Sequence, residues 1–399
     1  MTQDLLDPKT FAAGHPLELY RELRQTSPVH RNPEPHGPGF WALTRYDDVY
    51  AVDHDFQTFS SSPTIMIPDP GQGEGTMGEA KMMLMMDPPQ HTGFRKLIRG
   101  EFTKPAAAGK GLRLHELARQ IVDEVIEAGE CDFVAQVAGE MPSYVIAELM
   151  GLPLDDGREL YKLTEAIHSA PETQAPGAIQ DAVMKMFGYG MGVIAAKRAR
   201  PADDLATRLL EAEVEGRRLT DPEFLLFFLL LIDAGGDTTR NLLSSGLLAL
   251  QENPDQRAWL MADLPGRLAS AREELLRYAS PVIYMRRTAT RDTQVGETPI
   301  AAGDKVVMYF GAANRDPAKF DNPDALDLAR APNEHIAFGG GPHVCLGQHL
   351  ARIEIDAILT EVLTRMEDLQ IVGQPEWLAS TFISGPKSMH VRFRPGARS

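Results

Sequence analysis

The sequence predicts a mainly α-helical protein that also contains small β-sheets. Helical periodicity of apolar side chains extends over long segments, whereas the strand-like segments are short. The helical segments are residues 8–27, 46–54, 112–129, 141–150, 160–199 and 221–252. The strand-like segments are residues 39–44, 282–289 and 303–308. With 399 residues, 43% of them hydrophobic, the chain can bury a sizeable core. Its length allows two or three domains, but no linker-like run or repeat divides it.

The longest helical segment begins at Asp221-Pro222-Glu223 and continues to about Glu252. An acid that can cap the helix, then proline at the first helical position and a second acid, is a strong start signal. Gly235 and Gly236 lie in its middle, and a glycine there costs helix stability of about 1 kcal/mol. We therefore expect the glycines to serve a purpose there: either the close approach of a ligand or a local opening of the hydrogen-bond ladder.

Composition excludes several classes of protein. A net charge of −16 argues against general nucleic-acid binding, for which a basic face is expected. Cys131 and Cys345, far apart in the chain, do not make a disulfide scaffold. Residues 1–16 contain acids and no hydrophobic core, unlike a signal peptide. The longest apolar run, residues 224–232, is about half of what a membrane span needs. We expect a cytoplasmic protein without a membrane anchor.

The strongest functional signal is the segment from Phe338 to Gly347, Phe-Gly-Gly-Gly-Pro-His-Val-Cys-Leu-Gly. Its glycines and proline break regular structure, and a helix-forming sequence follows. Cys345 is therefore expected near a helix N-terminus, where backbone N–H groups and the helix dipole favour a thiolate over a thiol. A thiolate on such a loop suits an iron ligand. The alternative is a buried structural cysteine.

The pattern Phe-Gly-x-Gly-x-His-x-Cys-x-Gly resembles the haem-binding loop of the cytochrome P450 superfamily, and the resemblance covers essentially the whole chain. It implies a bacterial-type member with one domain over residues 1–399. The implied cytochrome P450 fold is a triangular prism with haem between the long central helix and the helix after the cysteine loop. The implied cofactor is haem b, with Cys345 as the axial iron ligand and His343 on a propionate. Phe338, Gly339 and Gly347 complete the loop around the haem.

Two further segments are candidates to hold the haem propionates. His91 and Arg95 are four residues apart, so on a helix they share one face, where two cationic donors can hold an anionic group. The alternative is a solvated face of a basic helix. The resemblance places such a His-x-x-x-Arg pair on a propionate. It also assigns Arg287 to a propionate, with Arg286 as the alternative if the register is off by one.

Asp237 and Thr238 place a carboxylate and a hydroxyl directly after the paired glycines. From the residues alone, the acid could pair with an arginine and the threonine could bond a backbone carbonyl. The segment resembles the oxygen-activation motif of the family, in which the threonine holds dioxygen and a water and the acid relays protons. Thr239 is a weaker candidate, and Asp233 is expected to be structural.

Residues 61–86 form a long irregular segment that is rich in methionine. Such loops are usually functional or disordered, and methionine recurs on adaptable binding surfaces. In the family this region caps the substrate pocket; the alternative is ordinary core packing. A break in the helical pattern at residues 171–176 suits a lid. The residues predicted to line the pocket are Met82, Met83, Ala234, Val282, Ile283, Phe382 and Ile383.

Residues 95–113 are locally basic in an acidic chain. The cations are Arg95, Lys96, Arg99, Lys104, Lys110 and Arg113, against the single acid Glu101. The resemblance puts this segment on the proximal side, where an acidic ferredoxin or flavodoxin docks by electrostatic complementarity. A solvated charge run is the alternative. Glu274 and Arg277 form a Glu-x-x-Arg pattern, which is weak alone but resembles a structural ion pair of the family.

The resemblance therefore implies a haem-thiolate monooxygenase that hydroxylates a hydrophobic small molecule. The substrate classes are sterols, terpenoids and fatty-acid-like chains, an inference from analogy of fold rather than from the site. Electrons are expected from NAD(P)H through ferredoxin and its reductase. A peroxide-driven peroxygenase is a rival that would not need Asp237 and Thr238. A non-catalytic haem-thiolate sensor or scaffold protein is a second rival, since it could retain Cys345.

Overall fold

The computed structural model of the protein describes residues 4–35, 37–69, 76–168 and 175–399. About 53% of the chain is helical. The described strands form one five-stranded sheet, one three-stranded sheet and four two-stranded ribbons. The mainly α-helical prediction with small β-sheets is confirmed. None of the described helices is long and apolar enough to cross a membrane.

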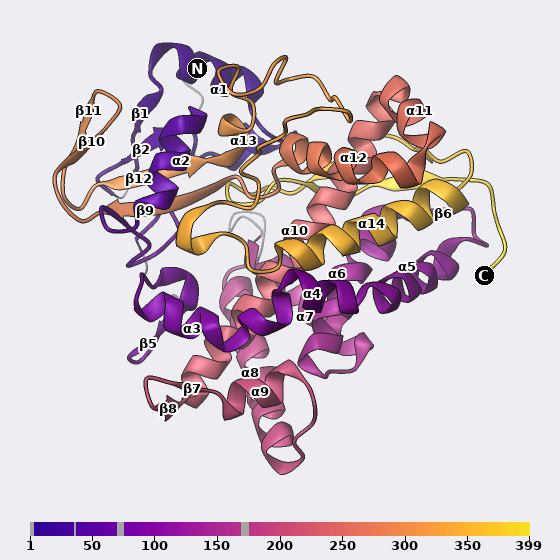
Figure 1. The fold of residues 1–399 in the computed structure, drawn as a ribbon, viewed down its shortest axis with the longest axis horizontal. Coiled ribbons are helices and arrows are strands. Elements are labelled where there is room, and N and C mark those ends of the chain that lie inside the picture. The colour runs from indigo at the N-terminus through magenta and orange to yellow at the C-terminus, as the bar shows by residue number, and fades with distance from the viewer. Residues whose placement is uncertain (1–3, 36, 70–75, 169–174) are drawn as a thin grey trace.

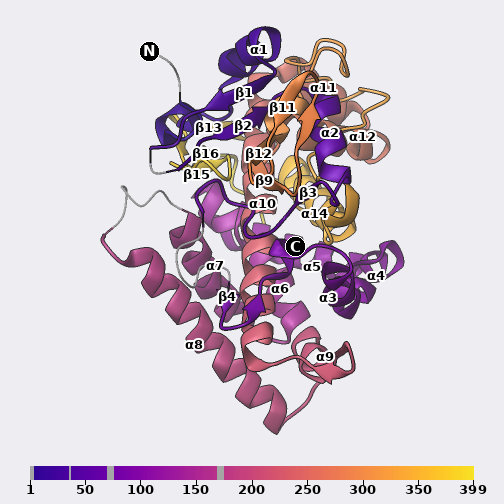
Figure 2. The same cartoon turned by 90° about the vertical axis from the view of Figure 1, so that its left-hand side faces the viewer.

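The helices surround one long central helix, α10 (Asp221–Glu252). Before it come α1 (Leu17–Thr26), α2 (Tyr46–His54), α3 (Gln90–Arg99), α4 (Lys104–Gly109), α5 (Gly111–Val125), α6 (Glu140–Met150), α7 (Leu154–His168), α8 (Ala178–Ala199) and α9 (Leu205–Glu211). After it come α11 (Pro254–Ala262), α12 (Leu264–Ala279), α13 (Phe310–Ala313) and α14 (Gln348–Arg365). Figure 2 shows α10 passing through the middle of the molecule, with α8 along one outer edge.

The five-stranded sheet has the order β1-β2-β12-β9-β3. Its strands are β1 (Val29–Asn32), β2 (Phe40–Leu43), β3 (Phe59–Ser60), β9 (Tyr284–Ala289) and β12 (Lys305–Tyr309). The three-stranded sheet joins β13 (Gln370–Ile371), β16 (His390–Arg392) and β6 (Glu130–Asp132). The ribbons are β4 (Thr76–Met77) with β5 (Ala80–Lys81), β7 (Glu213–Val214) with β8 (Arg217–Arg218), β10 (Thr293–Val295) with β11 (Thr298–Ile300), and β14 (Glu376–Trp377) with β15 (Pro386–Ser388). The large sheet lies beside α1, α2 and α13 (Figure 1).

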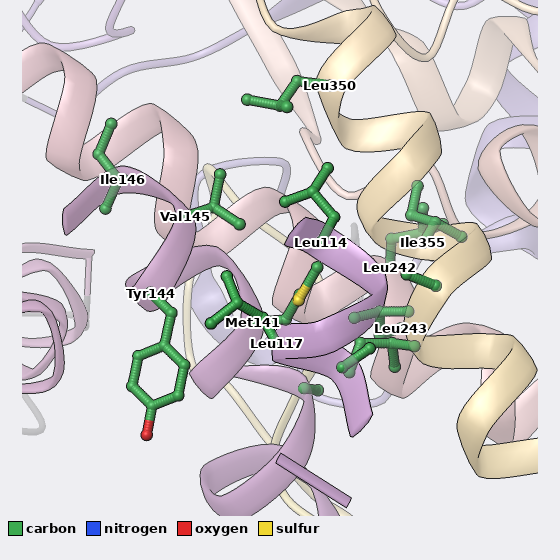
Figure 3. Close-up of a cluster of buried hydrophobic side chains, with 14 of the residues drawn as sticks. Leu114, Leu117, Met141, Tyr144, Val145, Ile146, Leu242, Leu243, Leu350 and Ile355 are labelled. Atoms are coloured by element: carbon green, nitrogen blue, oxygen red, sulfur yellow. The ribbon is translucent and has the colours of Figure 1, made fainter. Parts of the chain in front are cut away.

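The main hydrophobic core is built around α10, which packs against α6, α7, α8, α12 and α14. Helix α5 packs in turn against α6 and α14. Figure 3 shows side chains of four helices converging in this core. They are Leu114 and Leu117 of α5, Met141 and Val145 of α6, Leu242 and Leu243 of α10, and Leu350 and Ile355 of α14. Because α10 and α14 share this core, the residues at the start of α14 have a fixed position relative to α10.

Several predicted boundaries match the structure, and two do not. The helices predicted at residues 46–54 and 221–252 have the observed bounds of α2 and α10. The helix predicted at 8–27 is instead a 3₁₀ turn, η1 (Pro8–Phe11), followed by α1, because Gly14 adopts a left-handed φ of +94° between them. The cap of α10 is Thr220 rather than Asp221: Thr220 and Glu223 form a reciprocal capping box. Most of the predicted break at 171–176 and the glycines at 71–75 lie outside the described residues.

A buried charge network ties α12 to the chain that precedes the cysteine loop. Glu274 and Arg277 are fully buried and form a bidentate ion pair with distances of 2.7 and 2.8 Å. Glu274 also accepts from Arg330 Nε (3.1 and 3.2 Å) and from Asn333 Nδ2 (3.1 Å). The guanidinium of Arg277 donates to three backbone carbonyls, those of Asn314, Pro323 and Ala325. The network therefore fixes a segment without regular secondary structure.

We expect Glu274→Ala to lower the free energy of unfolding by about 3–5 kcal/mol, because it leaves two buried arginines without their counter-charge. Asp263→Ala is the matched control on the same helix, since it removes only the exposed side chain that caps α12 through Gly266 N–H. The control is expected to cost about 1 kcal/mol. Denaturant unfolding followed by circular dichroism measures both losses. Similar losses in the two variants would contradict this account of the network.

Candidate functional site

Cys345 lies between the short helix η6 (Gly341–His343) and the first turn of α14. Its backbone N–H donates to Phe338 O at 2.8 Å, which closes the loop on itself. The backbone N–H groups of Gly347 and Gln348 hydrogen-bond to the sulfur. These are among the N–H groups at a helix start that lack an intrahelical partner. The loop thus directs two donors at one sulfur atom.

Two opposing effects act on the Cys345 thiol. Removal from water raises its pKa, whereas the two N–H groups, Arg95 and Arg352 lower it. Burial is the larger effect, so the pKa of this thiol is raised despite the helix N-terminus. A coordinated metal cation deprotonates a thiol outright. The loop therefore suits a sulfur that becomes anionic when it binds a metal.

Four side chains gather beside this loop from three separate elements: His91 and Arg95 of α3, Arg287 of β9, and His343. The rings of His91 and His343 are 4.0 Å apart. Arg95 Nη2 donates to Val344 O at 2.6 Å, one residue before the cysteine. His343 Nε2 lies 3.0 Å from Ser61 Oγ. Arg287 is close enough to both imidazoles to lower their pKa values.

The two imidazoles of this group are neutral at neutral pH. Burial, with Arg95 and Arg287 acting in the same direction, lowers the pKa of His91 to about 4. Burial and then Arg287 lower the pKa of His343 to about 2. His91 therefore does not supply the second positive charge expected from sequence. Within the described part of the chain neither of its buried ring nitrogens has a hydrogen-bond partner. Buried polar atoms are normally paired, so this ring suits a polar ligand.

The two neighbouring arginines of β9 have different surroundings. Arg286 donates to Asp69 Oδ1 (2.8 Å) and to the carbonyls of Ile67 (3.0 Å) and Met66 (3.3 Å). Arg287 instead donates to Asp53 Oδ1 at 2.8 Å and lies with His91 and His343. Successive side chains of a strand point to opposite faces, which accounts for the difference. Of the two alternatives left by the sequence, the structure favours Arg287.

The centre of α10 carries the predicted acid and alcohol. Asp237 Oδ1 lies 3.4 Å from Arg240 Nη2, and both side chains are buried. Thr238 Oγ1 donates to Ala234 O at 3.2 Å. Both contacts that the sequence left open as alternatives are therefore present. Ala234 and Thr238 lie one turn apart and are exposed or half-buried, although α10 is otherwise mostly buried.

The paired glycines of α10 do not interrupt the helix. All residues from Asp221 to Glu252 are helical, so the local opening considered from sequence is not present in α10. A Cβ at Gly235 would make only ordinary contact with Ile146, and one at Gly236 only ordinary contact with Tyr161. These neighbours do not require glycine. The other explanation, approach of a ligand to this part of the helix, is the one that remains.

The predicted pocket residues come together only in part. Val282 pairs with Ile383 in an isolated antiparallel bridge, and Ile283 N donates to Phe382 O at 2.8 Å. Segments a hundred residues apart are thus adjacent. Met82, Val282 and Phe382 are half-buried, whereas Met83 and Ile383 are buried. Ile283 is fully buried in a second core with Leu19 and Tyr20, and its place in the pocket stays a prediction. Its strand neighbour Val282 faces the other way.

Some cations of the basic segment, residues 95–113, form ion pairs, so fewer of them are unpaired than the sequence indicates. Lys110 pairs with Glu101 at 3.3 Å, and Arg113 pairs with Glu148 of α6 at 2.8 Å. The side chains of Lys96, Arg99 and Lys104 are exposed and form no ion pair with any described residue. The unpaired positive charge is therefore concentrated on α3 and the start of α4.

Several residues that shape the site were not predicted from the sequence. Arg352 lies over the Phe338 ring at 4.6 Å and pairs with Glu273 at 2.8 Å. Arg330 completes the Glu274 network, and Asp53 bonds the cysteine loop from α2. Arg352, seven residues after Cys345 on the following helix, could have been found from helical spacing. Nothing local marks Asp53 or Arg330, because their partners lie far away in sequence.

Comparison with known proteins gives the family. Residues 177–368 match the family model of cytochrome P450. The steroid C26-monooxygenase of Rhodococcus jostii strain RHA1 is 35% identical, covering 98% of this chain and 84% of the relative. The methyl-branched lipid omega-hydroxylase of Mycobacterium tuberculosis is 36% identical, covering 93% and 90%.

Solved structures agree with this match. A Mycobacterium marinum cytochrome P450 in complex with pseudoionone superposes with a TM-score of 0.93 at 37% identity, covering 98% of this chain and 99% of the other. A Bacillus megaterium cytochrome P450 in complex with testosterone superposes with a TM-score of 0.86 at 30% identity, covering 97% and 99%. The chain belongs to the cytochrome P450 family. It is a cytochrome P450 monooxygenase, and the family implies a haem-thiolate cofactor and a separate electron donor.

The observed donor set fits a haem-thiolate group. Cys345 offers a sulfur with two N–H donors, and the adjacent Arg95 and Arg287 offer positive charge for acidic substituents. The unpartnered ring nitrogens of His91 offer further hydrogen bonds. On α10, the open positions Ala234 and Thr238 carry no charged side chain. Sulfur, cationic rim and apolar face are the three environments that such a group requires.

Proposed function

We propose that this monooxygenase hydroxylates a C–H bond of a steroid or of a branched, lipid-like chain. The observation that carries the proposal is the Cys345 loop, whose sulfur receives two N–H donors beside the cluster of His91, Arg95, Arg287 and His343. The names of the relatives, a steroid C26-monooxygenase and a methyl-branched lipid hydroxylase, support this narrower substrate class. In the balanced reaction, one oxygen atom enters the C–H bond and the other leaves as water, using two electrons and two protons.

Cys345 would hold the haem iron through its sulfur, and Arg95, Arg287, His91 and His343 would hold the acidic edge of the haem. When bound, the haem supplies the oxidising chemistry, and electron donation from a thiolate favours cleavage of the O–O bond. Phe338 and Gly339 close the loop beneath Cys345 through the Phe338 carbonyl. Gly347 contributes its N–H to the sulfur. These donors stabilise the charge on the sulfur and so tune its basicity.

The substrate is held by apolar side chains that are open to contact. Met82, Ala234, Val282 and Phe382 are half-buried or exposed. They come from the methionine-rich segment, α10, the residues before β9 and the C-terminal turn, which are all far apart in sequence. None of the four can ionise or donate a side-chain hydrogen bond. A surface of this kind selects for apolar shape.

Thr238 and Asp237 are assigned to proton delivery. The Thr238 hydroxyl donates to Ala234 O, so rotation about χ1 is enough to redirect its proton toward the open face of α10. Asp237 is adjacent in sequence and is held by Arg240. A carboxylate fixed in this way can take up a proton and release it again without leaving its place. A peroxide-driven reaction would not need this pair, so its presence favours the oxygen-dependent reaction.

Binding of an apolar substrate tests the proposed function directly. Titration with sterols, methyl-branched fatty acids and terpenes, followed by visible absorption, is expected to give a saturable low-spin to high-spin shift with at least one class. Ala234→Leu adds bulk to the open face of α10 and is expected to weaken that binding about tenfold, which corresponds to about 1.4 kcal/mol. The ferrous–CO spectrum of this variant should stay thiolate-like.

Two results would contradict the proposal in different ways. A thiolate-type spectrum with no shift from any apolar compound would exclude the substrate class but keep the cofactor. Failure of the purified protein to take up haem would exclude the assignment of Cys345.

We expect Thr238→Val and Asp237→Asn to lower the product formed per NAD(P)H consumed at least tenfold, with the missing electrons recovered as hydrogen peroxide. Each variant keeps the shape of the side chain but removes the group that moves a proton. Thr239→Val is the matched control, since Thr239 is buried and turned away from the open face. Product, NAD(P)H and peroxide are measured in the same reaction. A Thr239→Val defect as large as that of Thr238→Val would contradict the assignment.

The electron donor is proposed to be an acidic ferredoxin or flavodoxin that takes its electrons from NAD(P)H through a reductase. The unpaired cations Lys96, Arg99 and Lys104 form the proposed docking face. Arg95, next to Lys96 on α3, contacts the Val344 carbonyl directly before Cys345, so this face adjoins the ligand loop. A cytoplasmic location remains a prediction from the sequence.

We expect Lys96→Glu, Arg99→Glu and Lys104→Glu each to raise the KM for a surrogate acidic ferredoxin several-fold at low salt, and the difference from the unmodified protein to shrink at high salt. Lys185→Glu on α8 is the control, because it makes the same charge change at an exposed lysine outside this face. Steady-state rates at varied ferredoxin concentration provide the measurement. Equal effects of all four substitutions would show that only net charge matters.

A further inference from the structure

The last turn of α2 grips the cysteine loop with two adjacent side chains. Asp53 Oδ2 accepts from Gly340 N at 2.6 Å, and His54 Nε2 accepts from Gly341 N at 3.1 Å. His54 Nδ1 lies 2.7 Å from Tyr50 O, so this ring carries its proton on Nδ1. Two consecutive N–H groups of the loop, 287 residues away in sequence, thereby receive two consecutive acceptors.

The glycines of the loop fit this contact independently of the hydrogen bonds. A Cβ at Gly341 would lie 2.4 Å from the backbone oxygen of Asp53, and one at Gly340 would lie 2.3 Å from His54 Cε1. A Cβ at Gly339 would approach Asp53 Oδ2 to 3.3 Å. Gly339 and Gly341 also have left-handed φ values of +64° and +54°. All three glycines therefore face the end of α2, and the shape of the loop is set against that helix.

The carboxylate of Asp53 also binds a second partner through its other oxygen. Asp53 is 5% exposed, and its Oδ1 accepts from Arg287 Nη2 at 2.8 Å while Oδ2 is bound to the loop. Both oxygens accept, as in an ionised carboxylate. Burial raises the pKa of Asp53, and Arg287 and the Gly340 N–H oppose that effect. Because one short side chain holds both groups, the loop and the arginine cannot move independently.

We propose that Asp53 is a positioning residue for the haem-thiolate centre. It joins the loop of the Cys345 ligand to the Arg287 side chain, and it offsets the positive charge of Arg287. The proposal rests on the proposed function, in which Cys345 binds the iron and Arg287 holds an acidic edge of the haem. Asp53 is itself assigned neither to the iron nor to the acidic edge of the haem. It acts through Gly340 on the ligand loop and through Arg287 on the charge beside the haem.

Asp53→Asn is the sharpest variant, because the amide keeps the size of the side chain and one acceptor oxygen but removes the negative charge. The reduction potential of the ferric protein is expected to become more positive. Removing an anion from a desolvated site favours the state with the extra electron. A shift of about 59 mV corresponds to a tenfold change in the one-electron equilibrium constant and is the expected scale. A merely structural role would not move the potential of protein that keeps its spectrum.

Asp53→Ala removes both acceptor oxygens, and we expect it to release haem to apomyoglobin at least tenfold faster and to lose part of the thiolate-type ferrous–CO band. Asp47→Asn is the matched control, because it removes the same charge from the exposed start of the same helix. The control is expected to keep the potential and the haem-release rate of the unmodified protein. Should Asp53→Ala fail to fold, the potential and haem-release rate of Asp53→Asn still decide the question.

Each outcome separates the two levels of inference. A normal thiolate spectrum in the unmodified protein, with Asp53→Asn indistinguishable from Asp47→Asn in both potential and haem release, would overturn the role of Asp53 alone. Absence of thiolate-ligated haem from the unmodified protein would overturn the proposed function, and the role of Asp53 with it. A positive potential shift confined to the Asp53 variants would support both.

Discussion

The site depends on one constraint: a half-buried sulfur atom has to become anionic. Burial raises the pKa of the Cys345 thiol, and the protein opposes this with the N–H groups of Gly347 and Gln348 and with two arginines. Those arginines lie close to the loop and need balance of their own. Arg352 is paired with Glu273, whereas Arg95 donates to the Val344 carbonyl. Stabilising one charge in a low-dielectric site therefore requires further polar partners around it.

Buried arginines farther from the cysteine loop are balanced by carboxylates in the same way. Arg287 is balanced by Asp53, and Arg277 and Arg330 share the carboxylate of Glu274. Irregular segments lack the internal hydrogen bonds of a helix, so their carbonyls and N–H groups need other partners. Arg277 supplies donors to three such carbonyls, and Asp53 and His54 supply acceptors to two loop N–H groups. Buried ion pairs are thus used here for positioning rather than for net stability.

The sequence was informative where a feature is local. The bounds of α2 and α10 and the cysteine loop follow from patterns within short segments or from family resemblance. The roles of Asp53 and Arg330 could not be predicted, since their partners are brought together only by the fold. The neutral state of His91 was missed for a related reason: its charge depends on burial and on Arg287 from another element.

The neighbouring arginines of β9 show how strand register determines the charge of the site. Arg286 and Arg287 have the same charge and nearly the same burial, yet one holds the segment before residue 70 and the other lies beside the cysteine loop. Their directions follow from the pairing of Arg287 with Val306 and of Arg286 with Val307 in β12. A slip of one residue exchanges the faces of every side chain in a strand. It would turn the Asp69 partner toward the loop and Arg287 away from Asp53. Lys305, at the start of β12, also binds Asp69 (3.0 Å), so the strand that sets the register also anchors the segment that Arg286 holds.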